Sequence, residues 1–370
     1  MPVDYLYSPV IKGKSNDLRA AGCHLARVRN LMKPLVEILP LPEDATIESH
    51  VNEFCRAIRE HLQLGEVFVD FFGLLPTANL PDGQNAIVAG FHLLKGLGRS
   101  VTPTFGVWRD SVIWPLLKEV VIRHGQGFCF RVSADDLDDR AEDTWQEILS
   151  RSAELGLSTE FIDITLDLGD VEMLDVTETV DIVVDFLALK PAQLTFRSIA
   201  VVGASALRDV GTVPRDGVKA VFRKELDIWS RILFDLPPNQ KLIFGDYGVI
   251  HPKFSGGGGA RNMNAKIRYT AGDSIVIFRG HSRNGDGGQY HKLAQKVRGS
   301  KFYRGRELSA GDVYVDDCAN HRDGPGGPGD WVFADMNHHL AYTALQVERI
   351  SEQAGRELDA TRVAALIAEV

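Results

Sequence analysis

Short apolar runs alternate with longer amphipathic segments from residue 7 to about residue 250. Each apolar run is typical of a buried strand, and the segments between them have the apolar spacing of helices. Repeated strand–helix units require a parallel sheet, and eight of them close a (β/α)₈ barrel, the TIM-like fold. An open, doubly wound α/β sheet is the alternative. The predicted strands lie at residues 7–14, 33–40, 66–75, 100–108, 127–134, 159–169, 192–205 and 241–250.

A different pattern follows residue 250. It predicts a β-hairpin, a helix, a loop rich in glycine and proline, and a closing helix, at residues 264–280, 288–297, 321–330 and 337–355. The last βα loop of the barrel is therefore expected to carry an insertion before the eighth helix. The expected parts are the barrel strands and their helices at 1–250, the insertion at 251–336, and closing C-terminal helices of the same domain at 337–370.

Composition and charge narrow the class of protein. The chain has 370 residues, 44% of them hydrophobic, which is enough for a sizeable core. No apolar run approaches the roughly 20 residues that span a bilayer, and the N-terminus lacks the pattern of a secretory signal, so we expect a cytoplasmic protein. A net charge of −9 argues against generic nucleic-acid binding. The four cysteines form no CxxC pair, which argues against a zinc ribbon.

Charged residues interrupt the predicted strands, mostly toward their carboxyl ends. In (β/α)₈ proteins this end carries the ligand site, because the βα loops converge there. A charge inside a barrel is costly unless it is paired or lies near the open mouth. The residues concerned are Lys12, Lys14 and Arg131 on the basic side and Glu37, Asp70, Asp163, Asp167 and Asp246 on the acidic side.

Two interpretations of this ring remain open. The carboxylates of Glu37, Asp70, Asp167 and Asp246 suit Mg²⁺ or Mn²⁺, with the cationic side chains left to contact a phosphate. Alternatively, the charges neutralise one another as an ion-pair layer that fills the barrel.

The tetraglycine Gly256–Gly259 is not a phosphate-binding P-loop, because Ala260 and Arg261 follow it where GK[ST] is required. It is better suited to a flexible hinge. The predicted hairpin that follows carries Arg268 and Arg279, which we expect to fold over the barrel mouth as an anion clamp.

Adjacent histidines, His338 and His339, stand at the start of the predicted closing helix. Neighbours on a helix point about 100° apart, so the two cannot easily share one metal ion. With Asn337 as the N-cap, the pair would lie near the barrel mouth. We therefore take His338 as a candidate general base.

Several segments together resemble the Beta protein family of phages and satellite prophages. The most specific are the IRYT, FRG, YH and NHHL motifs, with Trp331 between the last two; the N-terminal motifs are weaker. They occur in SPVIKGKSNDLRAA, KPLVEILP, FGDYGVIHP, NAKIRYTAGDSIVIFRG, YHKLAQKV and ADMNHHLAYTAL.

The resemblance implies a role in phage exclusion or toxin neutralisation, since the family occurs in phages, satellites and genomic islands beside killing genes. It carries no established catalytic mechanism. The glycine-rich loops at 256–259 and 324–329 depart from the family pattern. The matching segments contain candidate mouth residues, namely Lys12, Lys14, Glu37, Asp246, Arg268, Arg279, His291 and His338.

Three functions are compatible with these features. The first is a defence or antitoxin component that binds a protein of its own operon, or a nucleotide-like phosphate ligand, at the barrel mouth. The second is a metal-dependent phosphoester hydrolase acting on a nucleotide or nucleic-acid-derived substrate. The third is a structural interaction module with paired interior charges.

The hydrolase hypothesis assigns each candidate residue a role. Catalysis would rest on Lys14, Glu37, Asp246 and His338, and the metal on Glu37, Asp70, Asp167 and Asp246. Ligand anions would contact Lys12, Arg131, Arg268, Arg279 and His291. The oligomeric state is not indicated by the sequence.

Overall fold

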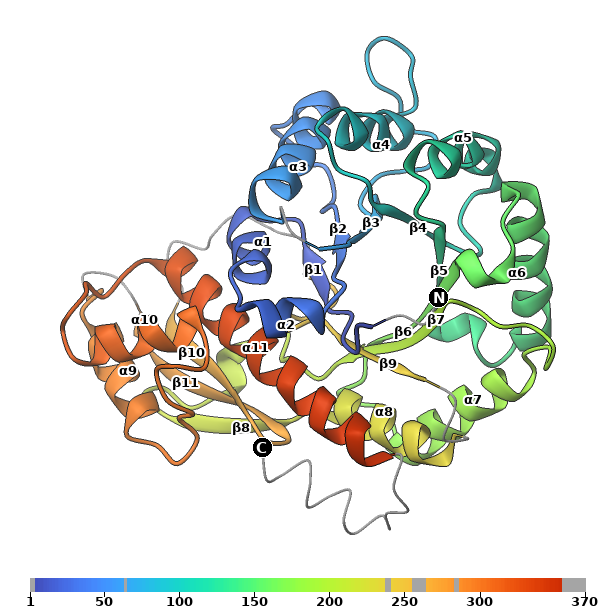
Figure 1. Cartoon of the computed structure of the whole chain (residues 1–370). Helices are drawn as coiled ribbons and strands as arrows, with labels where there is room; N and C mark the ends of the chain where they lie inside the picture. Colours follow the sequence, from blue (N-terminus) through green and yellow to red (C-terminus); the bar gives the residue numbers. More distant parts are fainter. Residues whose placement is uncertain (1–3, 63–64, 237–240, 255–263, 283–285, 355–370) are drawn as a thin grey trace.

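The computed structural model describes residues 4–62, 65–236, 241–254, 264–282 and 286–354. Its central feature is an eight-stranded parallel sheet in the order β1-β2-β3-β4-β5-β6-β7-β9 (Figure 1). All eight predicted strands are confirmed. They are β1 Val10–Lys12, β2 Leu35–Glu37, β3 Phe68–Asp70, β4 Thr102–Gly106, β5 Phe128–Ser133, β6 Ile162–Asp170, β7 Ser198–Ala204 and β9 Ile243–Asp246.

The sheet closes on itself through the segment that precedes β1. Tyr7 forms parallel bridges with Met32 on one side and Phe244 on the other. The Ser8 amide donates to the Phe244 carbonyl at 2.7 Å, and the Phe244 amide donates to the Leu6 carbonyl at 3.0 Å. The predicted (β/α)₈ barrel is therefore confirmed, and the open sheet is excluded.

Helices surround the barrel between successive strands (Figure 1). Side-chain caps fix several of their first turns; for example, Asn85 accepts hydrogen bonds from two amides at the start of α4, and Asp175 accepts one at the start of α7. The surrounding helices are α1 Ser15–Gly22, α2 Ala26–Asn30, α3 Ile47–His61, α4 Ala86–Gly96, α5 Trp114–His124, α6 Ala141–Leu155, α7 Val176–Ala188, α8 Lys224–Asp235 and α11 Pro328–Ala354.

The inward strand faces form layers. At the amino end, Asp163 accepts hydrogen bonds from Arg197 and Ser198. This position corrects the expectation that Asp163 joins the mouth residues, because Asp163 stands near the start of β6 rather than its end. Inward apolar side chains form a separate buried cluster that includes Val10, Leu35, Phe68, Cys129, Val202 and Ile243.

A second sheet, in the order β10-β11-β8, lies beside the barrel near α1 and α11 (Figure 1). The predicted hairpin is confirmed as β10 Asn264–Ala271 and β11 Ser274–Ser282, and the predicted helix as α9 Gln289–Arg298. Neither α10 Ala310–Ala319 nor β8 Val218–Phe222 was predicted; β8 comes from the loop after β7. Strand β8 is mostly exposed and at an edge, so it shows no clear apolar alternation.

The closing helix α11 begins at Pro328, so the expected boundary between residues 336 and 337 falls inside it. The start of this helix was not predicted, because several glycines surround it. Its first residue, Pro328, is nevertheless of a type favoured at the first helical position. Trp331, in the first turns, packs face to face with Tyr290 in the core of the inserted region. Among the described helices, none is long and apolar enough to cross a membrane.

Candidate functional site

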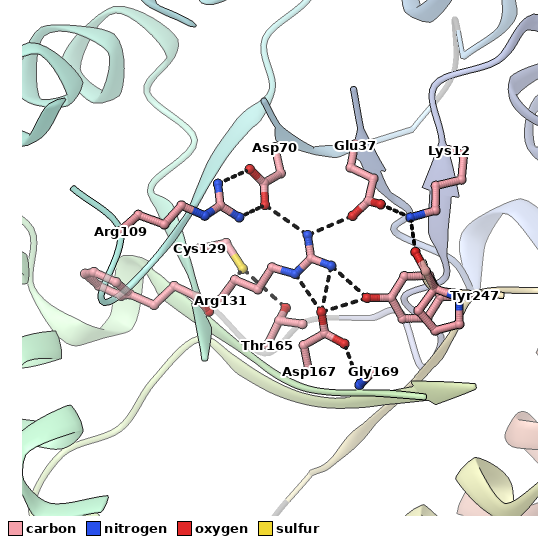
Figure 2. Close-up of polar contacts among 12 residues, drawn as sticks. Lys12, Glu37, Asp70, Arg109, Cys129, Arg131, Thr165, Asp167, Gly169 and Tyr247 are labelled. Carbon is pink, nitrogen blue, oxygen red and sulfur yellow. Dashed lines mark hydrogen bonds and ion pairs between the residues drawn. The ribbon is translucent and has the colours of Figure 1, made fainter. Parts of the chain in front are cut away.

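Six side chains form an ionic cluster at the carboxyl end of the barrel, which we call the mouth cluster (Figure 2). The parallel register explains it: Lys12 pairs in register with Glu37, and Glu37 with Asp70, so successive strands present their last inward residues at one level. The cluster consists of Lys12, Glu37, Asp70, Arg131, Asp167 and Tyr247.

Arg131 occupies the centre of the mouth cluster and is 6% exposed. Its Nη1 donates to Glu37 at 2.8 Å and to Asp70 at 3.0 Å. Its Nε donates to Asp167 at 2.8 Å, and its Nη2 donates to the Tyr247 hydroxyl at 2.7 Å. The planar guanidinium thus joins three strands, which an ammonium group could not do with the same geometry.

Other groups complete the pairing. Lys12 forms an ion pair with Glu37 and donates to the Pro252 carbonyl at 2.8 Å. Arg109, in the loop after β4, forms a bidentate pair with Asp70 at 2.6 and 2.7 Å. Although burial opposes ionisation, Arg109 and Arg131 hold the pKa of Asp70 below its ordinary value. Three cations therefore neutralise three carboxylates.

Asp246 does not join the mouth cluster, which corrects its expected role. On β9 the inward residues are Ile243 and Tyr247, so Asp246 shares the outward face with Phe244. It accepts hydrogen bonds from Tyr7 at 2.6 Å and from His339 at 2.8 Å. Although burial opposes ionisation, His339 and Arg223 lower the pKa of Asp246 to about 2.

His338 lies in a third network, inside α11 rather than at its start. Its Nδ1 faces the Asp312 carboxylate at 2.9 Å and its Nε2 faces the Thr270 carbonyl at 2.8 Å. Both ring nitrogens are therefore engaged within the protein, and neither is free to act on a ligand at the barrel mouth. Asn337 is likewise buried in mid-helix and donates to the Ala20 carbonyl. The expected N-cap is therefore wrong.

The remaining basic candidates are also dispersed. Lys14 follows β1, and its ammonium lies 4.3 Å from the centre of the Phe254 ring, outside the mouth cluster. Arg279 is buried and donates to the carbonyls of Gly211 and Val213, so it anchors a loop instead of clamping an anion. His291 faces the Cys318 carbonyl at 2.7 Å on α9.

A second group of charges, which we call the junction cluster, lies where α1, β10 and α11 meet. It contains Asp17, Lys266, Arg268 and Asp335. Of these, only Arg268 was predicted from the sequence as a site residue. Arg268 Nη1 lies 3.6 Å from Asp335 Oδ2. Both carboxylate oxygens of Asp17 lack a hydrogen-bond partner among the described residues, and so does Oδ1 of Asp335.

Burial dominates the electrostatics of the junction cluster. It raises the pKa of Asp17 to about 7 against the opposing effect of Lys14 and Arg268. It also raises the pKa of Asp335 to about 7, and it lowers the pKa of Lys266 to about 8. These groups therefore change charge near neutral pH.

The predicted metal set is not assembled. Glu37, Asp70 and Asp167 face Arg131, whereas Asp246 faces His339 on the other side of the sheet. Within the described ranges, no group of three or more histidine, cysteine or acidic side chains has an arrangement that could hold a metal ion. The predicted glycine hinge at 256–259 lies outside the described residues.

Exposed apolar side chains lie along one side of the mouth cluster. We call them the apolar rim; they lie on the loops after β2, β3, β4 and β6, which all leave the same end of the barrel. Phe72 is 54% exposed, and its ring lies 4.9 Å from the Arg131 guanidinium carbon. Met173 is 87% exposed. The rim comprises Leu41, Phe72, Leu75, Trp108, Val112, Met173 and Leu174.

The closed parallel sheet, its charged carboxyl end and the added three-stranded sheet define a (β/α)₈ barrel protein with an inserted α/β region. The model of the Beta protein family matches residues 7–344. The chain belongs to the Beta protein family, as the sequence motifs indicated. No curated protein matches it.

Solved structures that align with this chain do so at low sequence identity. A 3-hexulose-6-phosphate synthase is 10% identical, with a TM-score of 0.35 over 66% of this chain and 90% of that chain. Triosephosphate isomerase from Bartonella henselae is 12% identical, with a TM-score of 0.34 over 66% and 92%. Alanine racemase from Clostridium difficile 630, in complex with cycloserine, is 13% identical, with a TM-score of 0.32 over 74% and 61%.

Proposed function

We propose that this protein is a binding component of a phage-defence or toxin-neutralising system, and that it binds a partner protein of its own operon at the barrel mouth. The apolar rim is the observation that carries this proposal. Seven exposed large apolar side chains on four loops at one end of the molecule cost free energy in water, and such surfaces are typical of protein interaction sites.

The mouth cluster supports binding over catalysis. Glu37, Asp70 and Asp167 are already satisfied by cationic side chains, so none is free to hold a metal ion or activate water. The catalytic set expected for a phosphoester hydrolase is divided among separate networks. The paired charges make the centre of the mouth a rigid, neutral floor beneath Phe72.

Co-expression in bacteria tests the proposal. The toxin of the same operon is induced alone, with the wild-type protein, or with the double variant Phe72→Ser and Met173→Ser. We expect the double variant to lose neutralisation, because apolar anchors near the centre of an interface carry most of its binding energy. Both residues are largely exposed, so thermal unfolding of the variant should remain close to wild type.

A matched control removes two exposed apolar side chains elsewhere. Phe161 is 49% exposed before β6, at the amino end of the barrel, and Ile122 is 71% exposed on α5. The variant Phe161→Ser with Ile122→Ser should neutralise like wild type. If the rim variant, folded and expressed, also neutralises like wild type, the mouth is not the binding surface.

A further inference from the structure

The loops that carry the apolar rim are strongly acidic. The loops at residues 38–46, 71–85, 107–113, 134–140 and 170–175 contain eleven aspartates and glutamates against two arginines. These five segments follow β2 to β6, so they form one continuous arc of the mouth, which we call the acidic arc. Arg109 is bound to Asp70 and Arg140 lies 3.9 Å from Asp136, so together they offset at most one of the eleven carboxylates.

Much of this negative charge is available to a partner. Asp135, Asp138 and Asp139 are exposed on the loop after β5, and Glu43 and Asp44 are exposed on the loop after β2. None of these five forms an ion pair with another residue of the described chain. Their charges are therefore not used within the barrel, in contrast to those of the mouth cluster.

The rest of the mouth has a different charge. The loops after β1, β7 and β9 carry Lys14, Arg208, Arg215 and Lys253 against Asp209 and Asp216. The acidic arc is thus one side of a polarised mouth, and the apolar rim lies on that same side. A partner that buries the rim must approach the negative charges at the same time.

Phe72 links the two features. Its ring lies 4.8 Å from the Arg109 guanidinium carbon and 4.9 Å from that of Arg131, while half of its surface stays exposed. One part of the ring thus packs on neutralised arginines, and the rest is open to an apolar group from outside. Flanking cations on that partner would meet the acidic arc.

We propose that the acidic arc and the apolar rim together bind a basic protein surface that projects an apolar side chain onto Phe72. This inference rests on the proposed function and specifies the chemistry of its partner. Complementary charge accelerates encounter and fixes the orientation of the complex, while the buried apolar contact supplies most of the affinity.

Two other occupants are disfavoured by the same charges. A nucleic acid would bring phosphates against the acidic arc. A second copy of this chain in a two-fold contact would place one acidic arc against another, and like charges at an interface are repulsive.

A display experiment on the full-length protein tests the inference. A library of random short peptides is selected on the wild-type protein, and the most enriched peptide is synthesised for calorimetry. We expect enriched peptides to combine several lysines or arginines with a large apolar residue, and their affinity to fall steeply with salt.

Three variants separate the contributions. Replacing Asp135, Asp138 and Asp139 with asparagine should weaken binding of the synthesised peptide about tenfold at low salt. Replacing Glu53 with glutamine and Asp181 and Asp185 with asparagine, which removes the same charge from the exposed outer helices α3 and α7, should leave it unchanged. Phe72→Ser should abolish binding.

The outcomes distinguish the inference from the proposed function. If Phe72→Ser abolishes binding and the aspartate variant does not weaken it, or if enriched peptides are neutral or acidic, the basic partner is wrong while docking at the mouth stands. If Phe72→Ser changes nothing, or selection yields no peptide that depends on Phe72, both proposals fail. Dimerisation of the wild type through the mouth, detected by light scattering and lost in Phe72→Ser, would also overturn the inference.

Discussion

The mouth cluster and the junction cluster are two buried groups of charges with opposite electrostatics. In the mouth cluster, each carboxylate faces a cation or a phenol within hydrogen-bonding distance, and the pKa of Asp70 is lowered. In the junction cluster, Asp17 has no such partner and Asp335 has only Arg268, at 3.6 Å; both are buried, and their pKa values are raised to about 7. Pairing, rather than burial itself, decides whether a buried carboxylate is charged.

The difference also separates their structural roles. The mouth cluster is an ionic floor in which Arg109 and Arg131 lower the pKa of Asp70 against the effect of its burial. The junction cluster connects the barrel to the inserted sheet through α1, β10 and α11, and its charge changes near neutral pH. We therefore expect the mouth cluster to contribute more to the stability of the fold, and the junction cluster to determine how that stability depends on pH.

The largest expected effect comes from breaking the mouth cluster at its centre. Arg131→Met should lower the free energy of unfolding by about 3–5 kcal/mol, because it removes one partner from each of three buried carboxylates and leaves Asp167 without a cation. Urea unfolding followed by circular dichroism measures the change. Arg123→Met on the exposed face of α5 is the control and should cost less than about 1 kcal/mol. A loss below that limit for Arg131→Met would show that the cluster does not hold the barrel.

Converting both junction carboxyls to amides should have an intermediate effect that depends on pH. The pKa values of Asp17 and Asp335 rise from 3.8 to about 7 on folding, so their contribution to stability is complete below pH 4 and is lost as the pH rises through 7. The double variant Asp17→Asn and Asp335→Asn should not lose stability in this way, because amide side chains do not ionise. Its stability relative to wild type should therefore increase steadily between pH 4 and 7.

Unfolding in urea at a series of pH values measures this difference. The exposed Asp181→Asn serves as the control and should track wild type throughout. A constant difference between double variant and wild type across this range would mean that the two carboxyls are ionised in the folded protein. The contrast between the two clusters would then be wrong.

The smallest effect is expected at the Tyr247 hydroxyl, which accepts from Arg131 and donates to Asp167 at 2.7 Å. Tyr247→Phe should lower the free energy of unfolding by about 1–2 kcal/mol, because these two groups lose a buried partner. Thermal unfolding measures it. Tyr303→Phe is the matched control, since the Tyr303 hydroxyl has no hydrogen-bond partner among the described residues and should be dispensable.

Some of the candidate site followed from the strand pattern. Alternation placed Lys12, Glu37, Asp70, Arg131 and Asp167 inside the barrel, and their late position in each strand placed them at the mouth. The same alternation led to wrong positions for two residues. Asp246 faces outward from the barrel, and Asp163 lies at the amino end. Tyr247 was not predicted, because it is uncharged and follows the strand, and the prediction rested on charged residues within strands.

The sequence by itself determined the eight strand–helix units, the hairpin and the family, since hydrophobic periodicity and local motifs are properties of neighbouring residues. Only the tertiary structure decided which charges meet. Arg131 and Glu37 are 94 positions apart, and Asp246 and His339 are 93 apart, so their pairing depends on strand register and on where α11 packs. Packing likewise determines that Asp17 lacks a hydrogen-bond partner and that Phe72 is exposed, and local sequence patterns do not predict such packing.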